Sequence, residues 1–241
     1  MYTTVPRGHE AVEMSARSDQ QTAGKKIKVL LVDDHPIVRQ GLTQLIDQEE
    51  DMVVCGEAET PLEALKVIEE TKPSIVLVDI SLKEASGIEL VKDAKIRYPD
   101  LPVLVLSMHD ESFYAERVLR AGSRGYVTKE EATEKVLIAI RRVLAGEIYV
   151  SDKMASKMLS KLVDGRPGAE GFSLERLTDR ELEVFELIGQ GLSTRQIAKK
   201  LHLSIKTIES HRENIKRKLK LKNAAELLQH AIQWVQVEKA G

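Results

Sequence analysis

The stretch KVLLVDDHP, residues 28–36, runs from four aliphatic side chains directly into two neighbouring carboxylates, Asp33 and Asp34. A short unbroken apolar run is typical of a strand that is covered on both faces, as the strands of a parallel sheet are. Two adjacent negative charges at the end of such a strand repel each other and resist burial. A cation, or a ligand that brings one, is therefore expected beside Asp33 and Asp34.

Four further segments of the first half of the chain have the same strand pattern, and each of the five is followed by apolar residues at helical spacing. The expected strands are 27–32, 52–58, 74–80, 102–107 and 125–128. The expected helices are 38–48, 61–71, 87–98, 112–122 and 132–146. Five strand–helix units predict an α/β doubly wound, five-stranded parallel sheet of the flavodoxin-like type.

The pattern changes after residue 146, because only helical spacing follows. Residues 164–171, DGRPGAEG, have the composition of a flexible linker. Further helices are expected at 151–163, 177–191, 193–203, 204–221 and 223–235. We predict a flexible N-terminal extension, an α/β domain, a linker with a helix and a small all-α domain, at 1–25, 26–146, 147–173 and 174–241.

Charge is distributed unevenly along the chain. Residues 172–241 carry thirteen Lys and Arg against nine Asp and Glu, a net of +4, so that the total of −2 leaves −6 for the rest. This asymmetry indicates two domains with different partners. No apolar run is long enough to span a bilayer, residues 1–25 lack the apolar core of a signal peptide, and the single cysteine excludes an internal disulfide. A soluble, cytoplasmic protein without a membrane partner is expected.

Polar side chains follow four of the expected strands. In open α/β sheets, ligands bind beyond the carboxyl ends of the strands, where the strand order reverses. In the order 2-1-3-4-5, Asp33 and Asp34 after the first strand lie close to Asp79 at the end of the third. Ser107 ends the fourth strand and Lys129 follows the fifth, at the same edge of the sheet. Carboxylates bind Mg²⁺, and one carboxylate can act as the nucleophile that accepts a phosphoryl group. Mg²⁺ and an ammonium group neutralise the charge on the oxygens of that phosphoryl group. The set therefore predicts a site for Mg²⁺-dependent phosphoryl transfer.

The motifs LLVDDHPIVRQGL, IVLVDISL, VLVLS and AGSRGYVTK make residues 26–146 similar to the receiver domain of bacterial response regulators. The resemblance implies that Asp79 accepts phosphate from a sensor histidine kinase. It also implies that Asp34 binds Mg²⁺ directly and Asp33 partly through water, and that the backbone carbonyl of Ser81 completes the coordination. One departure is Lys83, where such receivers often have proline; this changes loop stiffness and leaves the acidic residues intact.

The resemblance also assigns residues on the last two strands. It implies that Ser107 and Lys129 contact the phosphoryl group. Tyr126 takes the place of the aromatic switch residue, which acts together with Ser107.

Residues 192–219 contain a short helical pattern, a turn at HLS and a longer basic helix at 204–219. This layout is typical of a helix-turn-helix, whose second helix enters the major groove of DNA. The faces of this helix that its apolar residues do not occupy carry the polar side chains Lys206, Thr207, Ser210, His211, Asn214, Arg217 and Lys218. Lys and Arg contacts to phosphate give affinity but do not read sequence.

Residues 174–237 resemble the LuxR-type helix-turn-helix domain, through LTDRELEVFELIGQGLSTRQIAKKLHLSIKTIESHRENIKRKLKL. The resemblance places Glu209, Ser210 and Glu213 where base edges are read. It implies that the DNA backbone is held by Lys206, Thr207, His211, Arg217 and Lys218. Relatives often have basic residues at 209 and 213, so the base preference differs here; an acid can accept from cytosine N4. DNA-bound dimers with residues 223–235 at the interface are also implied.

A receiver followed by this domain is the arrangement of NarL/FixJ response regulators. The expected function is a phosphorylation-dependent, DNA-binding transcription regulator rather than an enzyme. Its expected partners are a sensor histidine kinase, promoter DNA, a second copy of the chain and RNA polymerase.

Two other interpretations are open. One is a Mg²⁺ phosphohydrolase with an aspartyl nucleophile; such enzymes usually have a second acid near the nucleophile, and DISLK has none two residues after Asp79. The other is a factor whose receiver takes no phosphate and serves only for dimerisation. The complete acidic set argues against this second interpretation, and phosphate uptake at Asp79 is the observation that tests it.

Overall fold

The fold is given by a computed structural model, which describes residues 26–82, 86–109, 111–163 and 174–240. The expected N-terminal extension, the segment DGRPGAEG and Lys83 lie outside these residues. None of the described helices is long and apolar enough to cross a bilayer.

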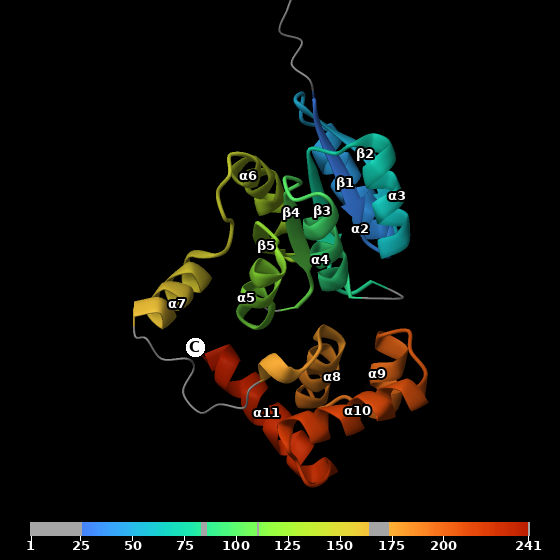
Figure 1. The fold of residues 1–241 in the computed structure, drawn as a ribbon, viewed down its shortest axis with the longest axis vertical. Coiled ribbons are helices and arrows are strands. Elements are labelled where there is room, and N and C mark those ends of the chain that lie inside the picture. The colour runs from blue at the N-terminus through green and yellow to red at the C-terminus, as the bar shows by residue number, and fades with distance from the viewer. Residues whose placement is uncertain (1–25, 83–85, 110, 164–173, 241) are drawn as a thin grey trace, which may run out of the picture.

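The first part of the described chain is a five-stranded sheet with the order β2-β1-β3-β4-β5, and all neighbouring strands are parallel (Figure 1). This confirms the predicted doubly wound sheet. The strands are β1 (Ile27–Val32), β2 (Met52–Ala58), β3 (Ile75–Asp79), β4 (Val103–Ser107) and β5 (Gly125–Thr128). The surrounding helices are α2 (Pro36–Asp47), α3 (Pro61–Thr71), α4 (Gly87–Arg97), α5 (Glu111–Ala121) and α6 (Ala132–Leu144).

Alternate residues of each strand enter two separate cores, one on each face of the sheet. Leu30 and Val76 pack with α3, α4 and α5, whereas Val29 and Leu77 pack with α2 and α6. All four side chains are at most 1% exposed, and burying such a side chain stabilises the fold by roughly 1.5–3 kcal/mol. Coverage on both faces explains why these strands are continuous apolar runs.

The chain that follows the sheet pairs with it once more. Tyr149 forms an isolated parallel bridge with Gly125: its N–H donates to the carbonyl of Arg124 at 3.0 Å, and its carbonyl accepts from Tyr126 at 2.8 Å. A side chain at Gly125 would place its Cβ 2.8 Å from the Tyr149 carbonyl oxygen, so the bridge requires glycine. Helix α7 (Asp152–Val163) comes next and contacts α5.

The last part is the predicted all-α domain. Its elements are the 3₁₀ helix η1 (Leu174–Arg176), α8 (Asp179–Gly189), α9 (Thr194–Lys200), α10 (Ile205–Leu219) and α11 (Ala224–Ala240). A capping box formed by Thr178 and Glu181 opens α8. Gly189 lets α8 lie directly on α11, since a Cβ there would come within 2.4 Å of the Ala231 carbonyl oxygen. In Figure 1 these helices lie beyond the end of the sheet to which the strands point, with α8 beneath α4 and α5.

Candidate functional site

Three carboxylates meet at the carboxyl edge of the sheet. Asp33 and Asp34 directly follow β1, and Asp79 ends the adjacent strand β3. All three are at most 5% exposed. One oxygen of each carboxylate and one ring nitrogen of His35 lie within 4.8 Å of one another. The structure thus brings the predicted acidic residues together at the reversal of strand order.

Lys129 neutralises only part of this charge. Its ammonium lies 2.6 Å from Asp33 Oδ2 and 2.6 Å from Asp79 Oδ2. Burial lowers the pKa of Lys129, but the charges of Asp79 and Asp33 outweigh this effect and raise it above its ordinary value. Burial also raises the pKa of Asp79, against the opposing effect of Lys129. Three buried carboxylates beside one ammonium leave room in the charge balance for a further cation.

The chemistry of these ligands fits Mg²⁺. Asp33 Oδ2 and Asp34 Oδ1 are buried without a hydrogen bond of normal geometry, although charged groups lie near them. Mg²⁺ prefers such carboxylate oxygens and keeps several water ligands. Asp33 and Asp34 can therefore hold Mg²⁺ together with Asp79, and receiver domains in general bind this ion at an acidic pocket.

His35 lies beside the acidic residues and was not among the predicted site residues. Its Nδ1 is 2.8 Å from Asp34 Oδ1 and 3.1 Å from Asp33 Oδ1, while its side chain is 56% exposed. Its position directly after the pair of aspartates was the available signal. His35 thus forms the polar, solvent-facing border of the site.

The two predicted switch residues, Ser107 and Tyr126, both form hydrogen bonds with the backbone of His109. Ser107 and Tyr126 are buried on β4 and β5. Ser107 Oγ accepts from the backbone N–H of His109 at 3.1 Å, and the Tyr126 hydroxyl donates to the carbonyl of His109 at 2.8 Å. On the other side, the N–H of Ser81 donates to Asp79 Oδ1 at 3.2 Å.

The His109 imidazole lies between the two domains. Its Nδ1 is 2.9 Å from Glu186 Oε2, and its Nε2 is 3.6 Å from Glu183 Oε1 and 3.0 Å from Ser81 Oγ. Burial lowers the pKa of His109, but Glu183 and Glu186 outweigh this and raise it to about 9. Sequence reasoning missed this cluster because its members come from segments about 75 residues apart (109 against 183 and 186) and share no periodic pattern.

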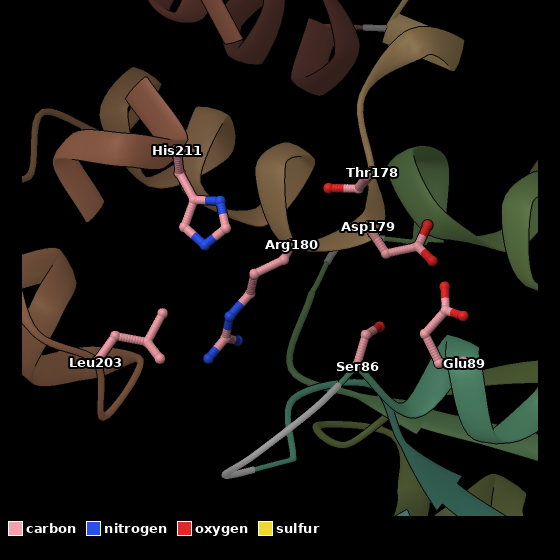
Figure 2. Close-up of a pocket in the computed structure, with 7 residues that line it drawn as sticks. All are labelled: Ser86, Glu89, Thr178, Asp179, Arg180, Leu203 and His211. Carbon is pink, nitrogen blue, oxygen red and sulfur yellow. The ribbon is translucent and has the colours of Figure 1, made fainter. Parts of the chain in front are cut away.

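A second group of contacts joins α8 to the receiver. Arg117 donates to Asp179 Oδ1 at 2.8 Å and also to backbone carbonyls of the helical domain, and Lys92 lies 3.3 Å from Asp179 Oδ2. A cavity of about 310 Å³ lies beside these contacts, and in Figure 2 Arg180 and His211 point into it from the helical domain. Its other lining residues are Ser86, Glu89, Thr178, Asp179 and Leu203.

Helix α10 carries the predicted DNA contacts. Exposed side chains on it are Lys206, Glu209, Ser210, Glu213 and Arg217, and the half-buried ones are Thr207, His211, Asn214 and Lys218. Lys218 already has a partner within the domain, since its ammonium lies 2.5 Å from Glu181 Oε2. Arg217 donates to Asn214 Oδ1 at 2.8 Å and remains exposed. The exposed predicted contacts are therefore two basic side chains, two acidic side chains and one hydroxyl.

An acidic pocket at the edge of this sheet, together with Ser107, Tyr126 and Lys129, defines a receiver domain, and the helical part carries a helix-turn-helix. Comparison with known proteins supports both assignments. Residues 29–141 match the response regulator receiver domain, and residues 175–231 match the luxR family of bacterial regulatory proteins. The oxygen regulatory protein NreC of Staphylococcus epidermidis is 33% identical over 211 residues, which cover 86% of this chain and 97% of that protein.

Solved structures give the same result. The structure of RcsB from Salmonella enterica serovar Typhimurium, bound to promoter rprA in the presence of the phosphomimetic BeF₃⁻, is 30% identical, with a TM-score of 0.55 over 86% of this chain and 98% of that one. A LuxR-family two-component response regulator from Aurantimonas sp. SI85-9A1 is 34% identical, with a TM-score of 0.54 over 58% of this chain and 99% of that one. The chain belongs to the NarL/FixJ family of response regulators. It is a regulator and not a phosphohydrolase.

Proposed function

We propose that a sensor histidine kinase phosphorylates this protein on Asp79, and that the phosphorylated protein binds promoter DNA as a dimer through α10. The observation that carries the proposal is the convergence of Asp33, Asp34 and Asp79 with the ammonium of Lys129. Membership of the family supports the class of regulator, and these side chains support the particular residue.

In the transfer, an oxygen of Asp79 forms a bond to phosphorus while the bond from phosphorus to the donor's imidazole nitrogen breaks. Lys129 neutralises charge on the oxygens of the moving group, because its ammonium already touches Asp79. Asp34, Asp33 and the carbonyl of Ser81 would hold Mg²⁺, which when bound supplies further positive charge to the same oxygens.

Ser107 and Tyr126 then transmit the conformational change at Asp79 to the surface of the receiver. The Ser107 hydroxyl lies at the end of β4, next to the phosphoacceptor strand β3, and can hydrogen-bond a phosphoryl oxygen. Both residues hold the backbone of His109, so movement of either changes the segment that faces the DNA-binding domain.

For DNA binding, we assign base contacts to Glu209, Ser210 and Glu213. The backbone contacts would come from Lys206, Thr207, His211, Asn214, Arg217 and Lys218. RcsB bound to promoter DNA, and RcsB dimers bound to DNA, support this use of the fold. We place α11 at the dimer interface and RNA polymerase among the partners. A protein that acts on promoters works in the cytoplasm, where bacterial DNA is.

Phosphorylation of the Asp79→Asn variant tests this function. The native protein should take up one phosphoryl group from acetyl phosphate in the presence of Mg²⁺, and the variant should take up none, because an amide is a poor nucleophile. Asp93→Asn is the matched control, since Asp93 is an exposed aspartate on α4. Equal incorporation by Asp79→Asn would place the phosphoryl group elsewhere, and no incorporation by the native protein would favour a receiver that serves only for dimerisation.

A further inference from the structure

His35 adds to the acidic pocket one ligand of a kind that Mg²⁺ does not prefer. The cluster of Asp33, Asp34, His35 and Asp79 offers three carboxylate oxygens and one ring nitrogen, all within 4.8 Å of one another. Mg²⁺ takes oxygen ligands, whereas imidazole nitrogen suits Zn²⁺ and other transition-metal ions. His35 has no part in the proposed Mg²⁺ site, so its place among these carboxylates calls for a different ion.

The His35 ring lies at ligand-to-ligand distances from all three carboxylates. Its Nδ1 is 2.8 Å from Asp34 Oδ1, 3.1 Å from Asp33 Oδ1 and 4.0 Å from Asp79 Oδ2. Zn²⁺ binds nitrogen and carboxylate oxygen at about 2.0–2.2 Å, so the ligand atoms of a tetrahedral site lie roughly 3.3–3.6 Å apart. The three distances bracket this separation, and small shifts of the four side chains can close them around one ion.

Asp34 indicates independently that a ligand belongs in the pocket. Its Oδ1 is buried and has no hydrogen bond of normal geometry, although His35 Nδ1 lies 2.8 Å away. The two atoms therefore lie side by side, as ligands of one ion do, and not as donor and acceptor. A buried carboxylate oxygen without a hydrogen bond is costly, and an ion between Asp34 and His35 removes this cost.

A cavity of about 40 Å³ borders Asp34 and His35. About 10–15 Å³ is enough for one water molecule, so an ion and a water molecule have room there. The His35 side chain is 56% exposed, which gives an ion a path from solvent. Of the two cations that also line the cavity, Arg180 is paired with Glu183 and Lys200 is exposed to solvent. Their repulsion of a metal ion is therefore weak.

We propose that His35 makes the acidic pocket a Zn²⁺ site, with Asp33, Asp34 and Asp79 as the other ligands. The inference deepens the proposed function and rests on it. Four protein ligands make a closed site, of the kind that holds Zn²⁺ without an open position. Zn²⁺ in this site occupies an oxygen of Asp79 and competes with Mg²⁺ for the same carboxylates. It therefore opposes phosphoryl uptake, and the ratio of the two ions sets the fraction of the protein that can be phosphorylated.

Metal binding by the full chain, measured by titration calorimetry, tests this assignment. His35→Ala should lower the affinity for Zn²⁺ by about 10-fold or more, a loss that even replacement of an outer-shell partner causes. The affinity of His35→Ala for Mg²⁺ should equal that of the native protein, whereas Asp34→Asn should weaken the binding of both ions. His202→Ala is the matched control, because His202 is an exposed histidine outside the four-ligand cluster. Its affinity for Zn²⁺ should be that of the native protein.

Two further measurements follow the bound ion. Co²⁺ in place of Zn²⁺ should give the native protein the intense visible absorption of a tetrahedral site, and His35→Ala should lose it. In phosphorylation of the native protein by acetyl phosphate with Mg²⁺, added Zn²⁺ should inhibit, and excess Mg²⁺ should restore the reaction.

The inference and the proposed function fail in different ways. Equal affinity for Zn²⁺ in the native protein and His35→Ala, an equal loss in His202→Ala, or phosphorylation that Zn²⁺ does not slow overturns the inference and leaves phosphorylation of Asp79 intact. A native protein that takes up no phosphate on Asp79 with Mg²⁺ alone instead overturns the proposed function, while calorimetry still measures the Zn²⁺ site.

Discussion

At the scale of single residues, the proposed phosphoacceptor site depends on charge balance. Asp33, Asp34 and Asp79 are buried, and Lys129 provides one positive charge among them. Their convergence could be predicted because each acid follows a buried strand, and parallel strands bring their carboxyl ends to one edge. The role of His109 could not be predicted, because its carboxylate partners belong to the other domain.

Ser107→Ala tests whether Ser107 couples phosphorylation of Asp79 to DNA binding. The variant keeps Asp79, Lys129 and the acidic pair, so we expect it to be phosphorylated. It loses the hydroxyl that accepts from His109, and its gain in DNA binding on phosphorylation should be smaller than that of the native protein. Binding of each protein to the same DNA, before and after phosphorylation, measures this gain. An equal gain in both proteins would show that Ser107 does not couple phosphorylation to DNA binding.

At the scale of elements, α8 explains where sequence patterns stop being informative. A surface helix normally buries one apolar stripe and exposes its charges. Leu182, Phe185 and their neighbours form that stripe in α8, but Glu183 and Glu186 are buried as well, because a second face packs on the receiver. Charged residues opposite an apolar stripe indicate a solvent-facing side, so the second buried face gave no signal. The bridge of Tyr149 to β5 was missed for a similar reason, since one paired residue makes no pattern.

The start of α8 should be sensitive to acid. Glu181 accepts from the N–H of Thr178 at 2.7 Å and pairs with Lys218. Burial raises the pKa of Glu181, but the hydrogen bonds from Lys218 and Thr178 outweigh it and lower the pKa below its ordinary value of 4.5. Its contribution is therefore present above pH 4.5 and is lost as the pH falls through the lowered pKa.

Glu181→Ala should cost about 1 kcal/mol of unfolding free energy at pH 7, the usual effect of losing a helix cap. Glu181→Gln should cost less, since glutamine also completes a capping box. Denaturant unfolding at pH 7 and in acid measures both differences. A cost for either variant that grows as the pH falls would contradict the assigned interactions.

Helix α10 should separate base reading from general affinity. Ser210→Ala and Glu209→Ala should relax base selection, and loss of a base contact costs about 1–3 kcal/mol on the preferred site. The effect of Glu209→Ala can be smaller, because removal of an acid also relieves repulsion from DNA. Lys218→Ala should weaken binding to preferred and random DNA alike and flatten the salt dependence by about one unit of slope.

The structure adds a control for this series. Lys218 also pairs with Glu181, so its replacement disturbs the domain itself, whereas Arg217 is exposed and donates to Asn214 on its own helix. Arg217→Ala should therefore reproduce the loss of general affinity without loss of stability. The measurement is the affinity of each variant for preferred and for random DNA over a salt series. Altered base selection in Lys218→Ala, or unaltered selection in Glu209→Ala and Ser210→Ala, would show that the docking register is wrong.

At the scale of the whole molecule, two domains of opposite net charge meet through ionic contacts. The sequence predicted the two folds and their charges, since both follow from local patterns. It did not predict the surface on which they meet, because Arg117, His109 and Lys92 find their carboxylate partners only when the domains are packed. The contact places α8 against the segments that follow β3 and β4, next to the proposed phosphoacceptor site.

Phosphorylation-dependent DNA binding is tested most directly by the affinity of one DNA fragment for the native protein and for Asp79→Asn, each with Mg²⁺ and with or without acetyl phosphate. Acetyl phosphate should raise the affinity of the native protein by about 5-fold or more and leave that of Asp79→Asn unchanged. An equal gain in both proteins, or no gain in a native protein that carries phosphate on Asp79, would contradict it.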